Sequence, residues 1–387
     1  MTDSLPPLTV MSVMSGTSFD GADAVCVQLG KRDGTLHWEV LGRAHRPYPT
    51  ELRTRLAASL DPARSDVLTL TQLHHELGLH WAELCAELAE TARPDLVALS
   101  GQTVYHVPRV EPERGWHVKS TLQIGEAAYT LERLGVPVMS DFRQSDLAAG
   151  GEGAPLVSFG DLKLYSKAGT DRAVHNLGGI SNLTLLPGSL DPAAVIAFDT
   201  GPANCLLDEA AERFLGQPYD RDGAAAARGT PAATMLEKLL AHPYFALPAP
   251  KTTGRELFTL DVILPETGTA ELAEKLSADD LLATLTAFTA HSVAAAYAQL
   301  PVQPAEVLVA GGGSFNPVLL RLLEEQLPFP VRTFAAAGFD ARDREALAFG
   351  VMAYYGLHGR VNILPHATGA RHGVAAGKLL RPAGQPV

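Results

Sequence analysis

The chain has 387 residues, of which 46% are hydrophobic and 19% charged, a balance that is typical of a globular protein and excludes widespread disorder. Its 31 basic and 43 acidic residues leave a net charge of −12 without long runs of one sign, which argues against nucleic acid or an anionic membrane as the main partner. The N-terminus lacks the features of a signal peptide, no run approaches a membrane span, and the three cysteines are far apart, so we expect a cytoplasmic protein.

The first part of the chain predicts the element order β-β-β-α-β-α-β, beginning with a three-stranded meander. The first helix carries leucines mostly on one face, as an amphipathic helix should. The expected elements are strands 8–13, 22–29 and 36–43, helix 68–92, strand 96–100, helix 126–134 and strand 137–140.

The second part of the chain echoes this order after the glycine-rich segment DLAAGGEGAPL. Its expected elements are strands 173–177, 183–186 and 195–198, helices 204–214 and 278–299, strand 306–310 and helix 317–326. Because the chain exceeds the size at which single cores stop growing, we expect two similar α/β domains facing a ligand cleft. Their expected bounds are residues 1–139 with 364–387, and residues 140–363.

The loop in MSGTSFDGADAV, from Met14 to Val25, follows a buried strand with small, hydroxyl and acidic residues. Gly16 and Gly21 allow backbone N–H groups to converge as an anion-binding nest. Asp20 would repel phosphate directly, so its useful role is to hold a hydrated Mg²⁺ ion that phosphate oxygens share. The alternative is a tight hairpin that needs glycine for positive φ. Three hydroxyl side chains in the loop suit phosphate oxygens: Ser15, Thr17 and Ser18.

Two more glycine-rich turns follow strands. NLGGISN, at 176–182, contains Gly178 and Gly179 and offers a second phosphate contact, or else a simple hairpin. AGGGSFNP, at 310–317, places three glycines between a strand and a helix, where a base or ribose can approach the backbone closely. Glycine-rich turns of this kind are common, so each one alone also fits an ordinary connection.

Asp199 lies in VIAFDTGPANCLLDE, where we expect it to end a strand before Thr200-Gly201-Pro202 turns into a helix. A carboxylate at a strand end that faces a cleft is well placed to act as a general base. The alternative is an aspartate that caps the turn or the helix beyond it.

Polar residues at two other places are candidates for binding a polar substrate. SDFRQSDLAAGGEGAPL contains Asp141, Arg143 and Asp146 beside flexible glycines, which fits substrate orientation, a hinge, or a plain interdomain linker. SGQTVYH offers hydrogen-bonding groups for a sugar-like ligand at a strand end, although a lone histidine there is more often structural. The side chains concerned are Gln102, Thr103 and His106.

Two further segments have plainer interpretations. Glu345 lies on a helix whose other positions look like a core face, so by default it is a solvated glutamate or one stabilised by the helix dipole. Lys251 and Arg255, in PKTTGRELF, read as surface residues in a polar loop.

Taken together, these stretches resemble the anhydro-N-acetylmuramic acid kinase family, within the fold group of sugar kinases, actin and the Hsp70 ATPase. The resemblance runs in family order from about residue 11 to residue 370. The segments that carry it are MSGTSFDGAD, SGQTVYH, TLQIGE, DFRQSDLAAGGEGAPLV, NLGGISNLTLL, FDTGPANCLLDE, PYFALPAPKTTGRELF, VAGGGSFNP and REALAF.

The resemblance implies two similar ribonuclease H-like domains of the actin, hexokinase and Hsp70 ATPase fold, flanking a nucleotide cleft, and a homodimer. ATP and Mg²⁺ are the implied cofactors, with Asp20 holding the metal through water. The implied nucleotide contacts are Gly16, Thr17, Ser18, Phe19, Asp20, Gly21, Ala22, Asp23, Gly178, Gly179, Gly311, Gly312, Gly313 and Asn316. The implied substrate contacts are Gln102, Thr103, Arg143, Asp146 and Glu345.

The implied reaction opens a 1,6-anhydro sugar and phosphorylates it in one site. Asp199, as the base, would activate a water that attacks the anomeric carbon, and the freed O6 would attack the γ-phosphate of ATP. The implied substrate is 1,6-anhydro-N-acetylmuramic acid, and the products are N-acetylmuramic acid 6-phosphate and ADP, in peptidoglycan recycling. Two alternatives stay open: an ordinary hydroxyl sugar kinase of the same fold, and a nucleotide-switched binding protein or filament subunit.

The chain departs from the family pattern at three places. Ser100 stands where the family usually has histidine, and Ala203 replaces the second glycine of FDTGPGN. LVSFGDLKLY differs from the usual LVPAFH near the expected domain junction. The first departure concerns sugar contacts, and the second concerns the turn beside Asp199.

Overall fold

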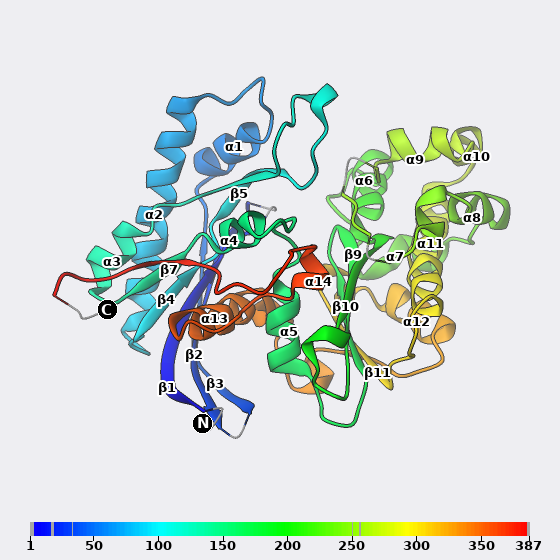
Figure 1. Cartoon of the computed structure of the whole chain (residues 1–387). Helices are drawn as coiled ribbons and strands as arrows, with labels where there is room; N and C mark the ends of the chain where they lie inside the picture. Colours follow the sequence, from blue (N-terminus) through cyan, green and yellow to red (C-terminus); the bar gives the residue numbers. More distant parts are fainter. Residues whose placement is uncertain (1–3, 17–18, 33, 250, 255–256, 385–387) are drawn as a thin grey trace. The chain divides into compact units, whose positions relative to one another are not determined.

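The computed structural model describes residues 4–16, 19–32, 34–249, 251–254 and 257–384 (Figure 1). The predicted nucleotide contacts Thr17 and Ser18 and the loop residue Arg255 lie outside these described residues.

The chain divides into two compact units, and each forms its own sheet. The first unit comprises Met1–Leu164 and Arg342–Val387, and the second comprises Tyr165–Ala341. The sequence predicted different bounds and assigned two segments of the first unit to the second domain: residues 140–164 and 342–363. The physical reason for the difference is that helix α13, described below, packs on the sheet of the first unit.

The first unit contains a six-stranded sheet with the order β13-β7-β4-β1-β2-β3. Strands β1, β2 and β3 form the antiparallel meander, whereas β4 pairs parallel to β1 and β7 pairs parallel to β4. The elements are β1 (Leu5–Met14), β2 (Gly21–Arg32), β3 (Thr35–Pro47), α1 (Thr50–Ser59), α2 (Val67–Ala89), β4 (Leu96–Leu99), β5 (Gln102–Val107), β6 (Ser120–Ile124), α3 (Ala128–Leu134), β7 (Val138–Ser140), α4 (Phe142–Ala148), α5 (Val157–Tyr165), α13 (Arg344–Leu357), α14 (Pro365–Thr368) and β13 (Lys378–Leu380).

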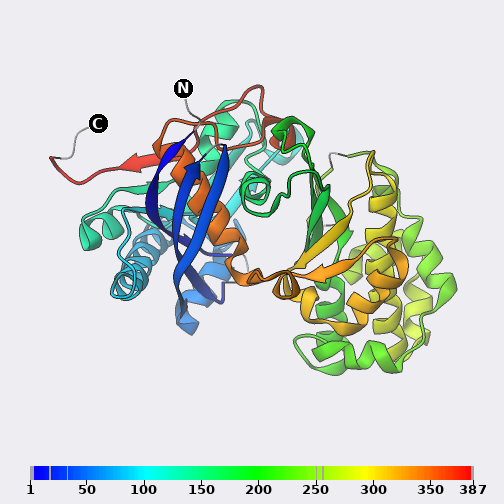
Figure 2. The ribbon, with the colours of Figure 1, turned by 90° about the horizontal axis from the view of Figure 1, so that it is seen from below.

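Both faces of this sheet are covered, which explains the nearly continuous apolar run of β1. Met11 and Val13 belong to the core that β2 and β4 share with α2. Ser12, between them, has its side chain on the opposite face of the sheet. It lies under α13, where Gly350 leaves room for it. Helix α13 contacts β1, β2 and β4, and Figure 2 shows it in orange along these strands.

The second unit contains a five-stranded sheet with the order β10-β9-β8-β11-β12. Here β8, β9 and β10 form the antiparallel meander, β11 pairs parallel to β8, and β12 pairs parallel to β11. The elements are β8 (Arg172–Leu177), β9 (Ile180–Leu186), β10 (Ile196–Pro202), α6 (Asn204–Leu215), α7 (Ala224–Arg228), α8 (Ala233–Leu240), α9 (Leu260–Glu266), α10 (Ala270–Lys275), α11 (Ala278–Ala298), β11 (Glu306–Ala310), α12 (Pro317–Gln326) and β12 (Val331–Thr333).

The two sheets therefore repeat one topology. Their first five strands in chain order lie in the order third-second-first-fourth-fifth, and the four pairings among them have the same sense in both units. The first sheet has one further strand, β13, which pairs antiparallel to β7. This repetition confirms the predicted fold class, two similar ribonuclease H-like domains. The β5–β6 hairpin was not predicted. The sequence-based statement that no segment approaches a membrane span was wrong for α11, which is long and apolar enough to cross a membrane. However, 78% of its most apolar 18-residue stretch is buried inside the protein, as in the core helix of a globular domain.

Helices α5 and α13 cross at a close contact in the first unit. A Cβ atom at Gly160 would lie 2.4 Å from the Cβ atom of Ala348, so only glycine permits this approach. One residue further along α5, Asp161 accepts two hydrogen bonds from the guanidinium group of Arg344, with N···O distances of 2.9 and 2.5 Å. Both side chains are almost completely buried. The segment LVSFGDLKLY, which departs from the family pattern, supplies this crossing helix.

We predict that Arg344→Met lowers the free energy of unfolding by about 3–5 kcal/mol, because it leaves the Asp161 carboxylate buried without its partner. Urea denaturation measures this loss. The control is Arg321→Met, which removes an exposed pair with Glu325 and should cost at most about 1 kcal/mol. The double variant Arg344→Met/Asp161→Leu should recover much of the loss, and equal effects of the two arginine substitutions would contradict the prediction.

Candidate active site

Asp199 lies inside strand β10, and not at its end as the sequence predicted. In the ladder with β9, Asp199 pairs with Asn182 and Gly201 pairs with Ser181, so Thr200 is the extra residue of a β-bulge. The strand continues to Pro202 because the ladder resumes beyond the bulge. The bulge thus places Asp199 at an irregular point of a strand, which is a common way to direct a functional side chain.

A loop more than 40 residues further along the chain holds Asp199 through three hydrogen bonds. The amide of Asp199 donates to the carbonyl oxygen of Lys251 at 2.9 Å, and the hydroxyl of Tyr244 donates to the carbonyl oxygen of Asp199 at 2.7 Å. The amide of Thr253 donates to Oδ2 of Asp199 at 2.9 Å. The N-cap residue of helix α6 is Ala203, and no side chain caps the helix, so Asp199 is not its capping residue. We call Tyr244, Lys251 and Thr253 the aspartate collar.

Lys251 is buried, with 7% of its surface exposed, so its assignment to the surface was wrong. Its Nζ atom donates to the carbonyl oxygens of Tyr244 and Phe245 at 3.2 and 3.4 Å and lies 4.8 Å from the centre of the Tyr244 ring. Burial lowers the pKa of Lys251. Burial, together with the charge of Asp199, raises the pKa of Tyr244 far above its usual value, so its hydroxyl stays a donor to Asp199.

The predicted turn at Gly178 and Gly179 contacts the start of helix α6. The carbonyl oxygen of Gly179 accepts hydrogen bonds from the amides of Ala203 and Cys205, and that of Gly178 accepts from the amide and side chain of Asn204. Ala203, the departure from the family's glycine, has a negative φ of −119°, so it lies outside the left-handed region that favours glycine. The turn beside Asp199 therefore does not need glycine for a positive φ at this position.

The third glycine turn packs against the end of β8. Gly311 has a φ of +82°, and a Cβ atom there would lie 2.7 Å from the carbonyl oxygen of Leu177. A Cβ atom at Gly313 would lie equally close to the Leu177 side chain. Asn316 caps α12, because its Oδ1 accepts hydrogen bonds from the amides of Val318 and Leu319. The structure thus brings the second and third predicted turns together.

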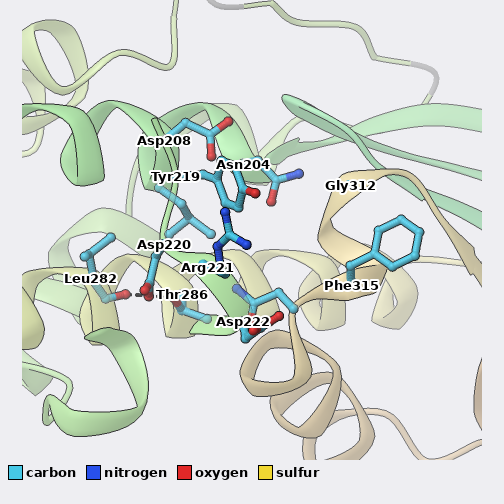
Figure 3. A pocket seen from close by; sticks show the side chains of 12 residues that line it. Asn204, Asp208, Tyr219, Asp220, Arg221, Asp222, Leu282, Thr286, Gly312 and Phe315 are labelled. Atoms are coloured by element: carbon cyan, nitrogen blue, oxygen red, sulfur yellow. Dashed lines mark hydrogen bonds between the residues drawn. The ribbon is translucent and has the colours of Figure 1, made fainter. Parts of the chain in front are cut away.

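A pocket of about 490 Å³ opens beside these turns, entirely within the second unit (Figure 3). This volume falls within the range of small-molecule sites. Of the predicted nucleotide contacts, Gly312 and Asn316 line it. The other lining residues are Asn204, Leu207, Asp208, Tyr219, Asp220, Arg221, Asp222, Leu282, Thr286 and Phe315.

The pocket combines aromatic surface with three carboxylates, one guanidinium group and several neutral polar groups. Phe315 is 69% exposed and projects from the turn that contains Gly312 (Figure 3). The guanidinium group of Arg221 lies 5.9 Å from the centre of the Tyr219 ring. The Asp220 carboxylate accepts hydrogen bonds from two amides in the first turn of α7, those of Ala225 and Ala226. An aromatic and carboxylate lining suits a base and the hydroxyl groups of a ribose better than it suits phosphate.

In the first unit, the loop after β1 is joined to the SGQTVYH segment by buried hydrogen bonds. Ser15 Oγ donates to Oε1 of the fully buried Gln102 at 2.5 Å and lies 2.6 Å from the hydroxyl of Tyr48. Burial raises the pKa of Tyr48 to about 12. Ser100, at the family's histidine position, accepts from the amide of Ser15 at 3.3 Å. The substitution therefore gives this loop an internal contact.

The fit of this loop to Mg²⁺ depends on Asp20, which is exposed. No group of three or more histidine, cysteine, aspartate or glutamate side chains suited to a metal occurs within the part of the chain that the structure describes. A single exposed carboxylate fits Mg²⁺, because this ion keeps several of its waters and is bound by one or two carboxylates together with phosphate oxygens of the substrate. The neighbouring Phe19 adopts a positive φ of 55° and is buried, which anchors the loop beside Asp20.

All five predicted substrate contacts lie on elements of the first unit: Gln102 and Thr103 on β5, Arg143 and Asp146 on α4, and Glu345 on α13. Arg143 interacts electrostatically with Asp146 and Glu345. Asp146 is fully buried, and its two oxygens accept hydrogen bonds from the amide of Gly153 at 2.7 Å and the hydroxyl of Thr368 at 2.6 Å. Burial raises the pKa of Asp146, and these hydrogen bonds oppose the shift.

The remaining groups of this region are partly exposed. Thr103 accepts a hydrogen bond from Gln123 at 3.1 Å, and Arg143 donates to the carbonyl oxygen of Gly153 at 3.2 Å. His106 lies 3.1 Å from the hydroxyl of Thr121. Burial, with the nearby Arg143, lowers the pKa of His106 from its usual 6.5 to about 4. His106 is therefore neutral at physiological pH.

Sequence reasoning missed the aspartate collar and most of the pocket. The segment PYFALPAPKTTGRELF was noticed, but nothing in it shows that Tyr244 and Thr253 lie against a residue 45 and 54 positions earlier. Tyr219 and Phe315 gave no signal, because single exposed aromatic residues are common on protein surfaces. Gly312 and Asn204, at the start of α6, are more than 100 residues apart in the sequence, and only the folded sheet brings them to one pocket.

These observations define the class of protein first: an α/β protein of the actin and hexokinase fold group, with a nucleoside-sized pocket and an aspartate held at a strand bulge. The model of the family described as "Anhydro-N-acetylmuramic acid kinase" matches residues 8–382. The chain belongs to the anhydro-N-acetylmuramic acid kinase family, as the resemblance predicted, and it is a kinase.

Curated relatives agree over almost their whole length. The chain is 42% identical over 384 residues to the anhydro-N-acetylmuramic acid kinase of Salinibacter ruber, with 97% of this chain and 96% of the relative covered. It is 43% identical to that of Streptomyces avermitilis, with 96% and 94% covered. It is 39% identical to that of Caldanaerobacter subterraneus subsp. tengcongensis, with 96% of each covered.

We predict that His106 makes the folded protein less stable as the pH falls from 6.5 to about 4. In this range the unfolded chain binds a proton at His106 and the folded protein does not, so protonation favours unfolding. The measurement is the free energy of unfolding of the wild type minus that of His106→Gln, which should fall through this window. If the difference between the two free energies of unfolding stays constant from pH 7 to pH 4, the pKa of His106 is not lowered in the folded protein.

Proposed function

We propose that the protein is an ATP-dependent kinase that opens the 1,6-anhydro ring of 1,6-anhydro-N-acetylmuramic acid and phosphorylates O6, giving N-acetylmuramic acid 6-phosphate and ADP, in peptidoglycan recycling. The names of its relatives support the sugar, and the observation that carries the chemistry is the fixed Asp199. Its amide, its carbonyl and one carboxylate oxygen are each hydrogen-bonded to the collar.

In the proposed reaction Asp199 acts as the general base. It takes a proton from water, and the water oxygen forms a bond to the anomeric carbon of the sugar while the bond from that carbon to O6 breaks. O6 then bonds to the γ-phosphorus of ATP, and the bond between that phosphorus and the ADP oxygen breaks. The water proton is finally released to solvent from Asp199. No separate acid is needed, because O6 passes directly to phosphorus.

A carboxylate with fixed backbone and fixed oxygen suits this role. Positioning contributes much of the rate in reactions that join bound partners, and the bulge and the collar restrict where Oδ1 and Oδ2 lie. The amide of Thr253 stabilises the ionised carboxylate, the form that accepts a proton. The neutral Tyr244 hydroxyl holds the carbonyl without adding charge.

We assign the nucleoside of ATP to the pocket of the second unit. Phe315 and Tyr219 offer surfaces on which a purine can stack, and the carboxylates near them can accept hydrogen bonds from ribose hydroxyls or a base amino group. The glycine turns at 178–179 and 311–313 adjoin this pocket and offer close backbone approach. Their roles as nucleotide contacts are part of this proposal.

We assign the phosphates and the sugar to groups of the first unit as well. The loop from Gly16 to Asp23 would contact phosphate oxygens, and Asp20 would hold Mg²⁺ through water. When bound, Mg²⁺ would neutralise charge on the phosphates. Arg143, Glu345 and Thr103 would contact the sugar directly, whereas Gln102 and Asp146 already have partners inside the unit and would also keep the surrounding loops in place. A homodimer and a cytoplasmic location stay predictions.

The proposal is tested by incubating the protein with the anhydro sugar, Mg²⁺ and ATP in ¹⁸O-labelled water. The expected product is a 6-phosphorylated reducing sugar with ¹⁸O at the anomeric carbon. Absence of any sugar-dependent ADP release would contradict kinase action on this sugar. Phosphorylation of free N-acetylmuramic acid, without turnover of the anhydro sugar, would favour the ordinary hydroxyl kinase.

We predict that Asp199→Asn lowers kcat by at least about 100-fold while ATP binding stays within about twofold, because the amide cannot accept the proton. Steady-state ADP release and calorimetric ATP binding measure the two effects. Asp191→Asn, an exposed carboxylate of the same unit, is the matched control and should behave as the wild type. Wild-type turnover by Asp199→Asn would remove Asp199 from the base role.

We also predict that Phe315→Ala weakens ATP binding about 10-fold, because a stacked base loses an aromatic partner. The control is Phe214→Ala, which removes another half-exposed phenylalanine of the second unit that does not line the pocket. Titration with ATP measures both dissociation constants. Equal affinities of the two variants would place the base elsewhere.

A further inference from the structure

A chain of four buried polar side chains runs through the second unit to the bulge beside Asp199. The hydroxyl of Thr200 donates to Ser181 Oγ at 2.6 Å, and Ser181 Oγ lies 2.7 Å from Nε2 of His175. Nδ1 of His175 lies 3.1 Å from the hydroxyl of Tyr297. All four residues are at most 1% exposed. We call these residues the buried relay.

The buried relay fits a neutral imidazole in either tautomer. The hydroxyl of Thr200 donates to Ser181 Oγ, and the two ring nitrogens of His175 lie within hydrogen-bonding distance of Ser181 Oγ and the hydroxyl of Tyr297. One nitrogen of a neutral imidazole donates and the other accepts, and a hydroxyl group can take either role. Both nitrogens therefore find a partner without a buried charge.

The position of Thr200 gives the buried relay a role beyond filling the core. Strand β10 is at the edge of its sheet and pairs with β9 alone, so it is held in the ladder from one side. At the bulge the ladder is interrupted, and Thr200 is the residue left out of register. Its hydroxyl, bonded to Ser181 Oγ and 3.3 Å from the Ser181 carbonyl oxygen, ties this residue to β9 instead.

The aspartate collar and the buried relay therefore hold neighbouring residues of one irregular segment. The collar holds Asp199 from the loop at 244–253. The relay holds Thr200 from the interior of the sheet. Replacing hydrogen-bonded partners by apolar residues of similar shape can cost little stability. Packing alone therefore does not require four hydrogen-bonded polar side chains at this point of the core.

We propose that Thr200, Ser181 and His175 are positioning residues for Asp199: the buried relay fixes the bulge of β10 and so the direction of the Asp199 carboxylate. This inference rests on the proposed function in that it treats Asp199 as the base. Releasing Thr200 would leave the nucleotide pocket intact and misplace the carboxylate, so the effect falls on turnover and not on ATP binding.

The test compares two substitutions of one residue with a matched control. Thr200→Val keeps the shape and removes the hydroxyl, whereas Thr200→Ser keeps the hydroxyl. Thr184→Val is the control, because Thr184 is a buried threonine of the same sheet whose side chain is not part of the relay. We expect Thr200→Val to lower kcat by about 10- to 100-fold with the KM for ATP changed less than twofold. Thr200→Ser should stay within about threefold of the wild type, and Thr184→Val should match it.

A second pair of variants tests whether the relay acts as a unit. His175→Gln keeps a side-chain acceptor for Ser181, whereas His175→Leu does not. We expect His175→Leu to lower kcat, and we expect the double variant with Thr200→Val to lose little more than Thr200→Val alone, since both break one chain. Fully multiplicative losses would overturn the relay, as would wild-type kcat in Thr200→Val or an equal fall of kcat in Thr184→Val.

Amide hydrogen exchange separates this inference from the proposed function, because it needs no activity. Thr200→Val should speed exchange at the amides of Asp199 and Thr253, which donate within the collar, while Thr184→Val leaves both rates unchanged. Unchanged exchange in Thr200→Val would overturn the positioning role. If the wild type releases no ADP with any sugar, the proposed function fails, and the exchange rates still decide whether the relay fixes the bulge.

Discussion

The buried ion pair between Asp161 and Arg344 is the interaction on which the architecture depends. The chain leaves the first unit at the end of α5 and returns to it at the start of α13, and this pair joins these two helices. Gly160 permits the helices to meet, and the two charges then neutralise each other out of water. Because α13 contacts β1, β2 and β4, the pair also helps to place the helix that covers one face of this sheet.

The second unit uses a different means to hold Asp199, the proposed base. A regular edge strand would fix Asp199 through its ladder, but the bulge interrupts the ladder at this point. Hydrogen bonds from the collar hold the backbone of Asp199 from the loop, and one more goes to the carboxylate itself. The neighbouring pocket is built on other elements, so in the proposed function nucleotide binding and chemistry would depend on different residues of one unit.

Features that depend on residues close together in the sequence were predicted, whereas features that depend on residues far apart in the sequence were not. Helix α12 was predicted with its observed bounds, because Asn316 and Pro317 mark its start locally. The meanders followed from apolar runs and glycine turns. Asp199 stays the proposed base, and its surroundings were misjudged: a bulge leaves no local signal, and Lys251 looked exposed because a charged residue is rarely buried. The domain bounds differed because α13 packs on strands more than 300 residues earlier, a pairing that local sequence does not encode.

The division of the first unit into two separated segments has a consequence for the order of events during synthesis. The sheet that emerges first from the ribosome lacks α13 and β13 until the whole of Tyr165–Ala341 has been made. The second unit, which is continuous, can complete its core earlier. The nascent chain therefore reverses the usual N-terminal-first order of domain folding, and one face of the first sheet stays uncovered until translation is almost finished.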